Sequence, residues 1–202
     1  ESFAKIIDEI ITNAGDQYIQ YPNLVKMIKV SLSKDGIIQV ENDGTFIEVM
    51  KVKSERGEEM YAAQMAFGEF RAGSNFEDDE KRITGGQNGL GAKITVVLSK
   101  YFTVETCDTK NKLLYKQTFR NGETSIEAEK PIIENAGKEK AFVRITFQPD
   151  YDHYKENITK FLPTVEKLIQ IRMMALACYT GLKCHFNDQE IKYDGLEDLV
   201  KM

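Results

Sequence analysis

Two oxygen-bearing side chains stand one helical turn apart near the start of the chain. Glu9 and Asn13 lie four residues apart in the stretch DEIITNAGDQ, so in a helix they share one face, with Asp16 on the same side. A carboxylate in this place can take a proton from water, and a carboxamide oxygen can complete the octahedral oxygen shell of Mg²⁺. A solvated polar face of an amphipathic helix is the plainer interpretation of the same pattern.

A glycine-rich stretch, KRITGGQNGLGAKITVVLS, runs from residue 81 to 99 and is typical of backbone that approaches an anion. It is not a P-loop, because Ala92 follows Gly91 where that motif needs lysine, and Lys93 is followed by Ile94. It is not a dinucleotide motif either, since no acidic residue ends a strand at the right distance downstream. A phosphate loop of a third kind and a plain turn both remain open.

Two further polar clusters have the residue types for nucleotide contacts. Asn42 and Asp43 precede a glycine in VENDG, where a side chain at a strand end can read the edge of a base, although a turn explains the same residues. Ser74 and Asn75 can hydrogen-bond a ribose or a phosphate. These residues lie in a long polar segment, 71–91, and loops of that length are usually functional or disordered.

The elements that must position these residues alternate along the chain. Apolar residues at 3, 6, 7, 10, 11 and 14 predict a helix, and alternation on either side of residues 34–36 predicts a hairpin. We also expect helices at 58–70, 92–101 and 163–181, strands at 101–108, 112–124 and 141–150, and a closing hairpin at 183–193. This order favours an α/β fold: a two-layer sandwich of one mixed, largely antiparallel sheet with helices on one face.

Composition sets the broad class. The 202 residues are 42% hydrophobic and 29% charged, as in ordinary globular proteins, and the net charge of −5 argues against sequence-independent DNA binding by this chain alone. No window approaches about 18 consecutive apolar residues, so we expect no membrane partner. The start lacks the pattern of a signal peptide, and the three cysteines have no C-x-x-C spacing. We therefore expect reduced cysteines in an intracellular protein.

In their order and spacing, the helix with Glu9 and Asn13, the strand ending in VENDG and the glycine-rich segment resemble the GHKL ATPases. Within that group, FAKIIDEIITNAGDQ, FRAGSNFEDDEKRITGGQNGLGAK, YFTVET and ITFQPD are similar to the ATPase domain of type IIA DNA topoisomerases of the eukaryotic and large-DNA-virus kind. The resemblance covers nearly all of the chain. It implies a single GHKL ATP-binding domain over residues 1–202, with ATP and Mg²⁺ as ligands.

The resemblance also implies roles for particular residues. Glu9 is expected to be the general base that activates water, Asn13 to hold the Mg²⁺ ion, Asn42 to bind the adenine amino group and Thr146 to lie near the adenine. The other ATP contacts that it implies are Gly73, Ser74, Asn75, Gly86, Gln87, Asn88, Gly89, Leu90, Gly91, Ala92 and Lys93. The glycine-rich segment would then be an ATP lid that wraps the phosphates.

Several positions depart from the family pattern. The family usually writes the adenine motif as N-x-G-x-G-I-P, whereas this chain has Phe46 in place of the second glycine and Glu48 in place of the proline. Gln87 stands where eukaryotic relatives often carry arginine, and Leu90 replaces an aromatic residue. We expect an altered pocket wall near the base and weaker nucleotide binding than in a eukaryotic relative.

The function that the resemblance implies is that of the N-terminal clamp module of a type II topoisomerase, which couples ATP binding to gate dimerisation and DNA strand passage. DNA and a second copy would be bound through the full-length protein, in the nucleus or at a viral replication site. Family members add a transducer domain whose lysine reaches the γ-phosphate, so we expect slow turnover from this module. Two alternatives are another GHKL ATPase, of the chaperone or mismatch-repair type, and a nucleotide-sensing module that does not hydrolyse ATP.

Overall fold

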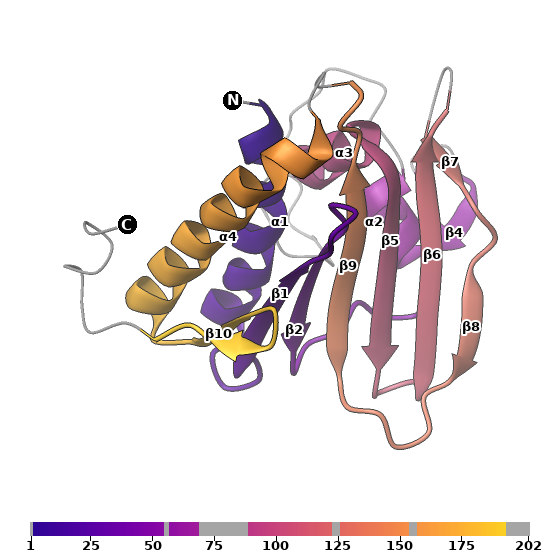
Figure 1. The fold of residues 1–202 in the computed structure, drawn as a ribbon. Helices are drawn as coiled ribbons and strands as arrows, with labels where there is room; N and C mark the ends of the chain where they lie inside the picture. Colours follow the sequence, from indigo (N-terminus) through magenta and orange to yellow (C-terminus); the bar gives the residue numbers. More distant parts are fainter. Residues whose placement is uncertain (1, 55–56, 69–88, 123–125, 154–156, 193–202) are drawn as a thin grey trace, which may run out of the picture.

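The chain forms one large sheet with helices packed on one face (Figure 1). A computed structural model describes residues 2–54, 57–68, 89–122, 126–153 and 157–192. The helices are α1 (Ser2–Gln20), α2 (Ala62–Gly68), α3 (Gly89–Val97) and α4 (Ile158–Thr180). The strands are β1 (Met27–Leu32), β2 (Ile38–Asp43), β3 (Lys51–Lys53), β4 (Glu59–Tyr61), β5 (Ser99–Asp108), β6 (Leu113–Asn121), β7 (Ile126–Ala128), β8 (Ile132–Asn135), β9 (Phe142–Pro149), β10 (Lys183–Phe186) and β11 (Gln189–Glu190).

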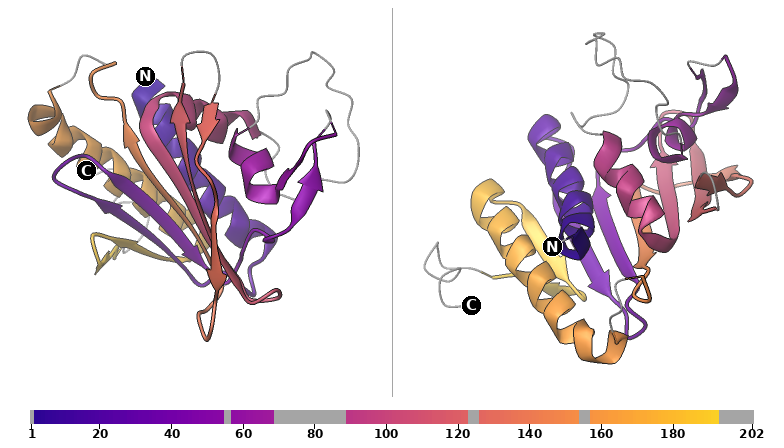
Figure 2. Two further views of the ribbon diagram at one scale, coloured as in Figure 1. Left: turned by 90° about the vertical axis from the view of Figure 1, so that its right-hand side faces the viewer. Right: turned by 90° about the horizontal axis from the view of Figure 1, so that it is seen from above.

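The sheet is mixed but mainly antiparallel, as the sequence predicts. Eight of its nine strands follow the order β11-β10-β1-β2-β9-β5-β6-β7, and β8 pairs with β6. The β1–β10 pair is parallel, whereas the pairs of β2, β5, β6 and β9 are antiparallel. The view from above in Figure 2 shows α4, α1 and α3 side by side on one face of this sheet. The expected two-layer α/β sandwich is therefore confirmed.

Helix α1 lies between α3 and α4 in the helical layer, and its apolar residues form one stripe. The predicted stripe is buried in full: Phe3, Ile6, Ile7, Ile10, Ile11 and Ala14. It faces β2 of the sheet and belongs to the same buried core as Ile38, Val40 and Phe147. Glu9 and Asn13 lie at the border of the stripe and are partly exposed. In the described part of the chain, no helix is both long and apolar enough to cross a membrane.

The structure corrects three of the expected elements between residues 58 and 101. The range expected as a helix, 58–70, begins with strand β4, which pairs with β3; helix α2 covers Ala62–Gly68, and residues 69 and 70 lie outside the described residues. The helix expected at 92–101 starts earlier, at Gly89, and ends at Val97, because Ser99 already pairs with β9. The segment 71–91 is therefore helical from Gly89 onward, and its remainder lies outside the described residues.

Helix α4 begins five residues before the expected start at Pro163. The side chain of Asn157 caps it, accepting a hydrogen bond from the Lys160 backbone N–H at 3.3 Å. A proline is typical of the first helical position, but here the cap defines the start and Pro163 lies inside the helix. The expected end at Gly181 is confirmed, since Gly181 has φ 70° and its N–H bonds to the Ala177 carbonyl. Strands β3, β7 and β8 were not expected, because they are short and lack clear alternation.

Candidate functional site

The Glu9 carboxyl and the Asn13 carboxamide meet on one side of α1, as their spacing predicts, and are joined by a hydrogen bond. Burial raises the pKa of Glu9 above its ordinary value, the hydrogen bond from Asn13 opposes that shift, and the negative charges of Asp16 and Asp8 raise the pKa further. Asp8 itself is paired with Arg172 of α4 at 3.0 Å. A carboxylate with a raised pKa is a better proton acceptor than an ordinary surface glutamate.

The first turn of α3 lies directly against Glu9. A side chain on Gly91 would overlap the Glu9 carboxyl group where it now lies, so the glycine leaves room for this close approach. Thr95, which is fully buried, joins the two helices: its hydroxyl is 3.1 Å from the Gly91 carbonyl and 3.4 Å from the Ile6 carbonyl of α1. The N-terminal end of α3, which is the positive end of the helix dipole, therefore lies beside the candidate base.

Two other residues expected at the phosphates, Ala92 and Lys93, lie in α3 and are buried. Gly89 and Leu90 form the start of the same helix. The remaining members of the expected lid fall outside the described residues: Gly73, Ser74, Asn75, Gly86, Gln87 and Asn88. The described part of the glycine-rich segment thus contributes a helix N-terminus to the site rather than an isolated turn.

Asn42 faces the helical layer from the end of β2. It pairs in register with Ile28 of β1 and Val143 of β9, is only 3% exposed, and its Nδ2 donates to the Thr45 hydroxyl at 2.7 Å. The neighbouring Asp43 has a structural role instead, because its Oδ1 accepts the backbone N–H groups of Lys26 and Met27 at 2.7 and 2.8 Å. The stretch VENDG therefore combines an inward-facing amide with a structural carboxylate.

Gly44 makes the turn that follows β2. Its φ of 77° lies in the left-handed region, and a side chain there would overlap the Leu24 carbonyl. Thus the turn that the sequence suggested for VENDG and the inward-facing Asn42 coexist in this structure. The turn fixes the direction in which the next residues leave the sheet.

The connection from Gly44 to Met50 is held against the end of β5. The Ile47 N–H donates to the Thr106 hydroxyl at 2.9 Å, and the Val49 N–H donates to Asp108 Oδ2 at 2.9 Å. Asp108 is fully buried and also accepts two hydrogen bonds from Asn111. Burial raises the pKa of Asp108, but these hydrogen bonds outweigh it and hold the pKa below its ordinary value. This anchored connection carries Phe46 and Glu48, two of the departures from the family pattern.

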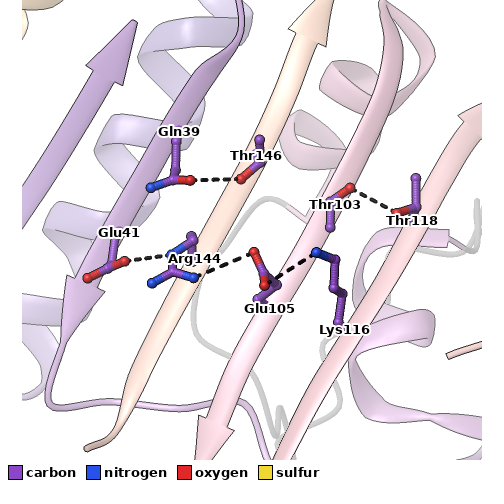
Figure 3. Close-up of polar contacts among 8 residues, drawn as sticks. All are labelled: Gln39, Glu41, Thr103, Glu105, Lys116, Thr118, Arg144 and Thr146. Carbon is purple, nitrogen blue, oxygen red and sulfur yellow. Dashed lines mark hydrogen bonds and ion pairs between the residues drawn. The ribbon is translucent and has the colours of Figure 1, made fainter. Parts of the chain in front are cut away.

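Thr146 is not brought to this group. It lies on the opposite face of the sheet, where its hydroxyl is 3.4 Å from Gln39 Oε1 and its register partner on β5 is Thr103 (Figure 3). The alternation of side chains along a strand could have predicted this placement. Ile145 and Phe147 are both buried on the helical side, so Thr146 between them must point to the other face. On the helical side, the β9 residue opposite Asn42 is Val143.

Comparison with known proteins gives relatives over nearly the whole chain. The chain is 38% identical over 202 residues to DNA topoisomerase 2 of Candida albicans and 36% identical over 200 residues to the probable DNA topoisomerase 2 of Dictyostelium discoideum. Both matches cover 98% of this chain but only 13% of the relative. No protein-family model matches the chain.

Solved structures agree with these relatives. The ATPase region of Saccharomyces cerevisiae topoisomerase II matches with a TM-score of 0.78 and 27% identity, over 98% of this chain and 51% of that one. The ATPase and transducer domains of the Balamuthia mandrillaris enzyme match with a TM-score of 0.74 and 30% identity, over 98% and 50% of the two chains. The ATPase domain of Thermus thermophilus gyrase B, at 22% identity, shares the fold. The chain belongs to the family of the GHKL ATPase region of type IIA DNA topoisomerases.

Proposed function

We propose that this chain binds ATP with Mg²⁺ and hydrolyses it, with Glu9 as the general base. The observation that carries the proposal is the contact between the Glu9 carboxyl and the first turn of α3, which places a proton acceptor of raised pKa beside a helix N-terminus. Phosphate oxygens bound at that N-terminus would lie next to Glu9. The resemblance of the three motifs and the family of the chain support the same assignment.

In this mechanism Glu9 takes a proton from the water that attacks the γ-phosphate. The bond from the water oxygen to phosphorus forms while the bond to the bridging β–γ oxygen breaks, and ADP and phosphate leave. The backbone N–H groups at the start of α3 stabilise the charge on the phosphate oxygens. Asn42 holds the adenine amino group from the end of β2.

The described residues fit a magnesium ion that is bound mainly by phosphate and water. Asn13 offers one carboxamide oxygen beside the Glu9 carboxylate, and no group of three or more His, Cys, Asp or Glu residues gathers as a metal cage within the described ranges. Mg²⁺ usually keeps several waters and takes few protein oxygens in nucleotide sites. When bound, the ion would neutralise charge on the phosphates, while Asn13 positions it.

Within a longer protein, the module would act as an ATP-operated clamp. The matched relatives are named DNA topoisomerase 2, and the chain spans 13% of their length. We propose that ATP binding closes a dimeric gate and that hydrolysis resets it after a DNA duplex has passed. DNA contacts and the second copy would come through the full-length protein, in the nucleus or at a viral replication site.

Calorimetric titration with a non-hydrolysable ATP analogue tests the site directly. We expect saturable binding that requires Mg²⁺ for full affinity and is lost in Asn13→Ala and in Asn42→Ala. Asn23→Ala, an exposed asparagine in the turn after α1, is the matched control and should bind like the parent chain. No binding at millimolar nucleotide would contradict the proposal.

A second experiment separates hydrolysis from simple nucleotide sensing, an alternative to which Phe46 and Gln87 still point. In a longer protein that includes the transducer region, Glu9→Gln should abolish turnover and leave the affinity for the ATP analogue unchanged. If the parent protein bound ATP but turned over no faster than Glu9→Gln, the module would be a sensor rather than an ATPase.

A further inference from the structure

The seam between α1 and α3 contains a hydroxyl group that contacts both helices. Thr95 is fully buried, and its side-chain oxygen lies 3.1 Å from the Gly91 carbonyl of its own helix and 3.4 Å from the Ile6 carbonyl of α1. A carbonyl oxygen only accepts hydrogen bonds, so the hydroxyl is the donor in both contacts and shares its one hydrogen between them. A threonine in a helix often bonds to the carbonyl four residues earlier, but that local habit does not supply the acceptor on α1.

The candidate base lies in the same seam. Gly91, one helical turn before Thr95, lies against the Glu9 carboxyl, whereas Thr95 itself contacts Ile6, which precedes Glu9 by three residues. The contacts therefore run in opposite directions along the two helices, which lie side by side in Figure 2. The first turn of α3 is at the Glu9 end of the seam, and Thr95 ties α3 to α1 one turn further along.

This hydrogen bond bears on catalysis because the two halves of the proposed reaction lie on different helices. The phosphates would be held by backbone N–H groups of α3, and the attacking water would be activated by Glu9 on α1. A displacement of α3 would carry the phosphates with it and leave Glu9 behind. A misplacement of about 1 Å between reacting groups can lower a rate by about 100-fold.

We propose that Thr95 is a positioning residue for ATP hydrolysis, which holds the first turn of α3 at its working distance from Glu9 through the hydrogen bond to the Ile6 carbonyl. This inference rests on the proposed function, because it assumes that α3 binds the phosphates and that Glu9 is the base. It goes beyond that function in assigning part of the rate to a fully buried side chain outside the proposed nucleotide contacts.

The test separates chemistry from binding in a longer protein that includes the transducer region. Thr95→Val replaces the hydroxyl with a methyl group of similar size, and both carbonyls can keep the backbone hydrogen bonds of their own helices, so we expect the variant to fold. Its kcat should fall about tenfold, because the phosphates and Glu9 are no longer aligned. Its Kd for a non-hydrolysable ATP analogue should stay within about twofold of the parent value, because the nucleotide moves with α3. Thr95→Ser keeps the hydroxyl and should restore most of kcat.

Ser99→Ala is the matched control. It removes another buried hydroxyl, one that bonds at 2.6 Å to the Thr95 carbonyl rather than to α1, and it should leave kcat unchanged. If Thr95→Val does not fold, Thr95→Ala gives the same comparison. An unchanged kcat in the folded variant, an equal loss of kcat and affinity, or a Thr95→Ser protein as slow as Thr95→Val would overturn this inference alone. A Glu9→Gln protein that turns over like the parent would overturn the proposed function with it.

Discussion

Glu9 combines a partly buried carboxyl with two acidic neighbours on its own helix, and its protonation is open to direct measurement. Burial, Asp16 and Asp8 raise its pKa, and the Asn13 hydrogen bond lowers it. The Glu9 carboxyl should therefore titrate above its ordinary value of 4.5 in a carbon-13 NMR titration of this chain. Asp16→Asn removes one of the negative charges, so the midpoint should move to lower pH.

The control for this titration is Asp35→Asn, a change in the exposed turn between β1 and β2. It should leave the Glu9 midpoint in place. If the titration midpoint of Glu9 did not change in Asp16→Asn, the Asp16 carboxylate would have no influence on Glu9. Because the base acts when it is deprotonated, the turnover of a longer, active protein should fall as pH drops through the same midpoint.

Gly91 is the second residue whose effect can be predicted from a single contact. Gly91→Ala should gain about 1 kcal/mol of helix propensity, but its methyl group would overlap the Glu9 carboxyl. We expect no net gain in thermal stability and a loss of turnover, because Glu9 must move away. Gly15→Ala in α1 is the matched control: its methyl group would meet only the flexible end of Leu176, at 2.8 Å. A stable and fully active Gly91→Ala protein would contradict this account.

At the scale of elements, the connection between β2 and β3 depends on Asp108 at the end of β5. Its carboxylate accepts the Val49 N–H and two bonds from Asn111. Asp108→Ala leaves buried donors unpaired and should cost about 2–4 kcal/mol in the free energy of unfolding. Chemical denaturation measures this loss. Asp152→Ala, at an exposed ion pair with Lys100, should change stability by less than about 1 kcal/mol.

The pH dependence of the same element follows from the lowered pKa of Asp108. A carboxyl whose pKa is lower in the folded state contributes stability above its unfolded pKa and loses it as pH falls through the folded pKa. The stability difference between parent and Asp108→Ala should therefore be constant near neutral pH and shrink below about pH 4. A difference that persists unchanged at pH 2 would contradict a role for the ionised form.

At the scale of the whole molecule, we expect the rate of ATP hydrolysis to depend on a transducer domain of the kind that the family resemblance implies. The structural match covers about half of the yeast ATPase region, 51% of that chain. We expect the 202-residue chain to bind nucleotide but to hydrolyse it slowly, because the resemblance implies a γ-phosphate lysine from a transducer domain. Steady-state phosphate release, compared with a protein extended through the transducer region, checks this expectation. Equal rates would contradict it.

The elements that the sequence predicts well are those whose signal lies within a short window. The stripe of α1 and the hairpin around residues 34–36 repeat with the period of their own structure, and both are confirmed. The end of α4 at Gly181 is likewise local. By contrast, β7 and β8 exist because β6 pairs with them. The sequence of a strand of three or four residues does not indicate which strand it will pair with.

For the site, the sequence by itself determined the pairing of Glu9 with Asn13, because a four-residue spacing in a helix fixes which side chains meet. Only the tertiary structure decided that Gly91 lies against Glu9 and that the buried amide of Asn42 is hydrogen-bonded to the Thr45 hydroxyl. It also placed Thr146 on the far face of the sheet. The physical reason is that helix spacing is set by one backbone geometry, whereas contacts between elements depend on register and packing among residues far apart in the chain.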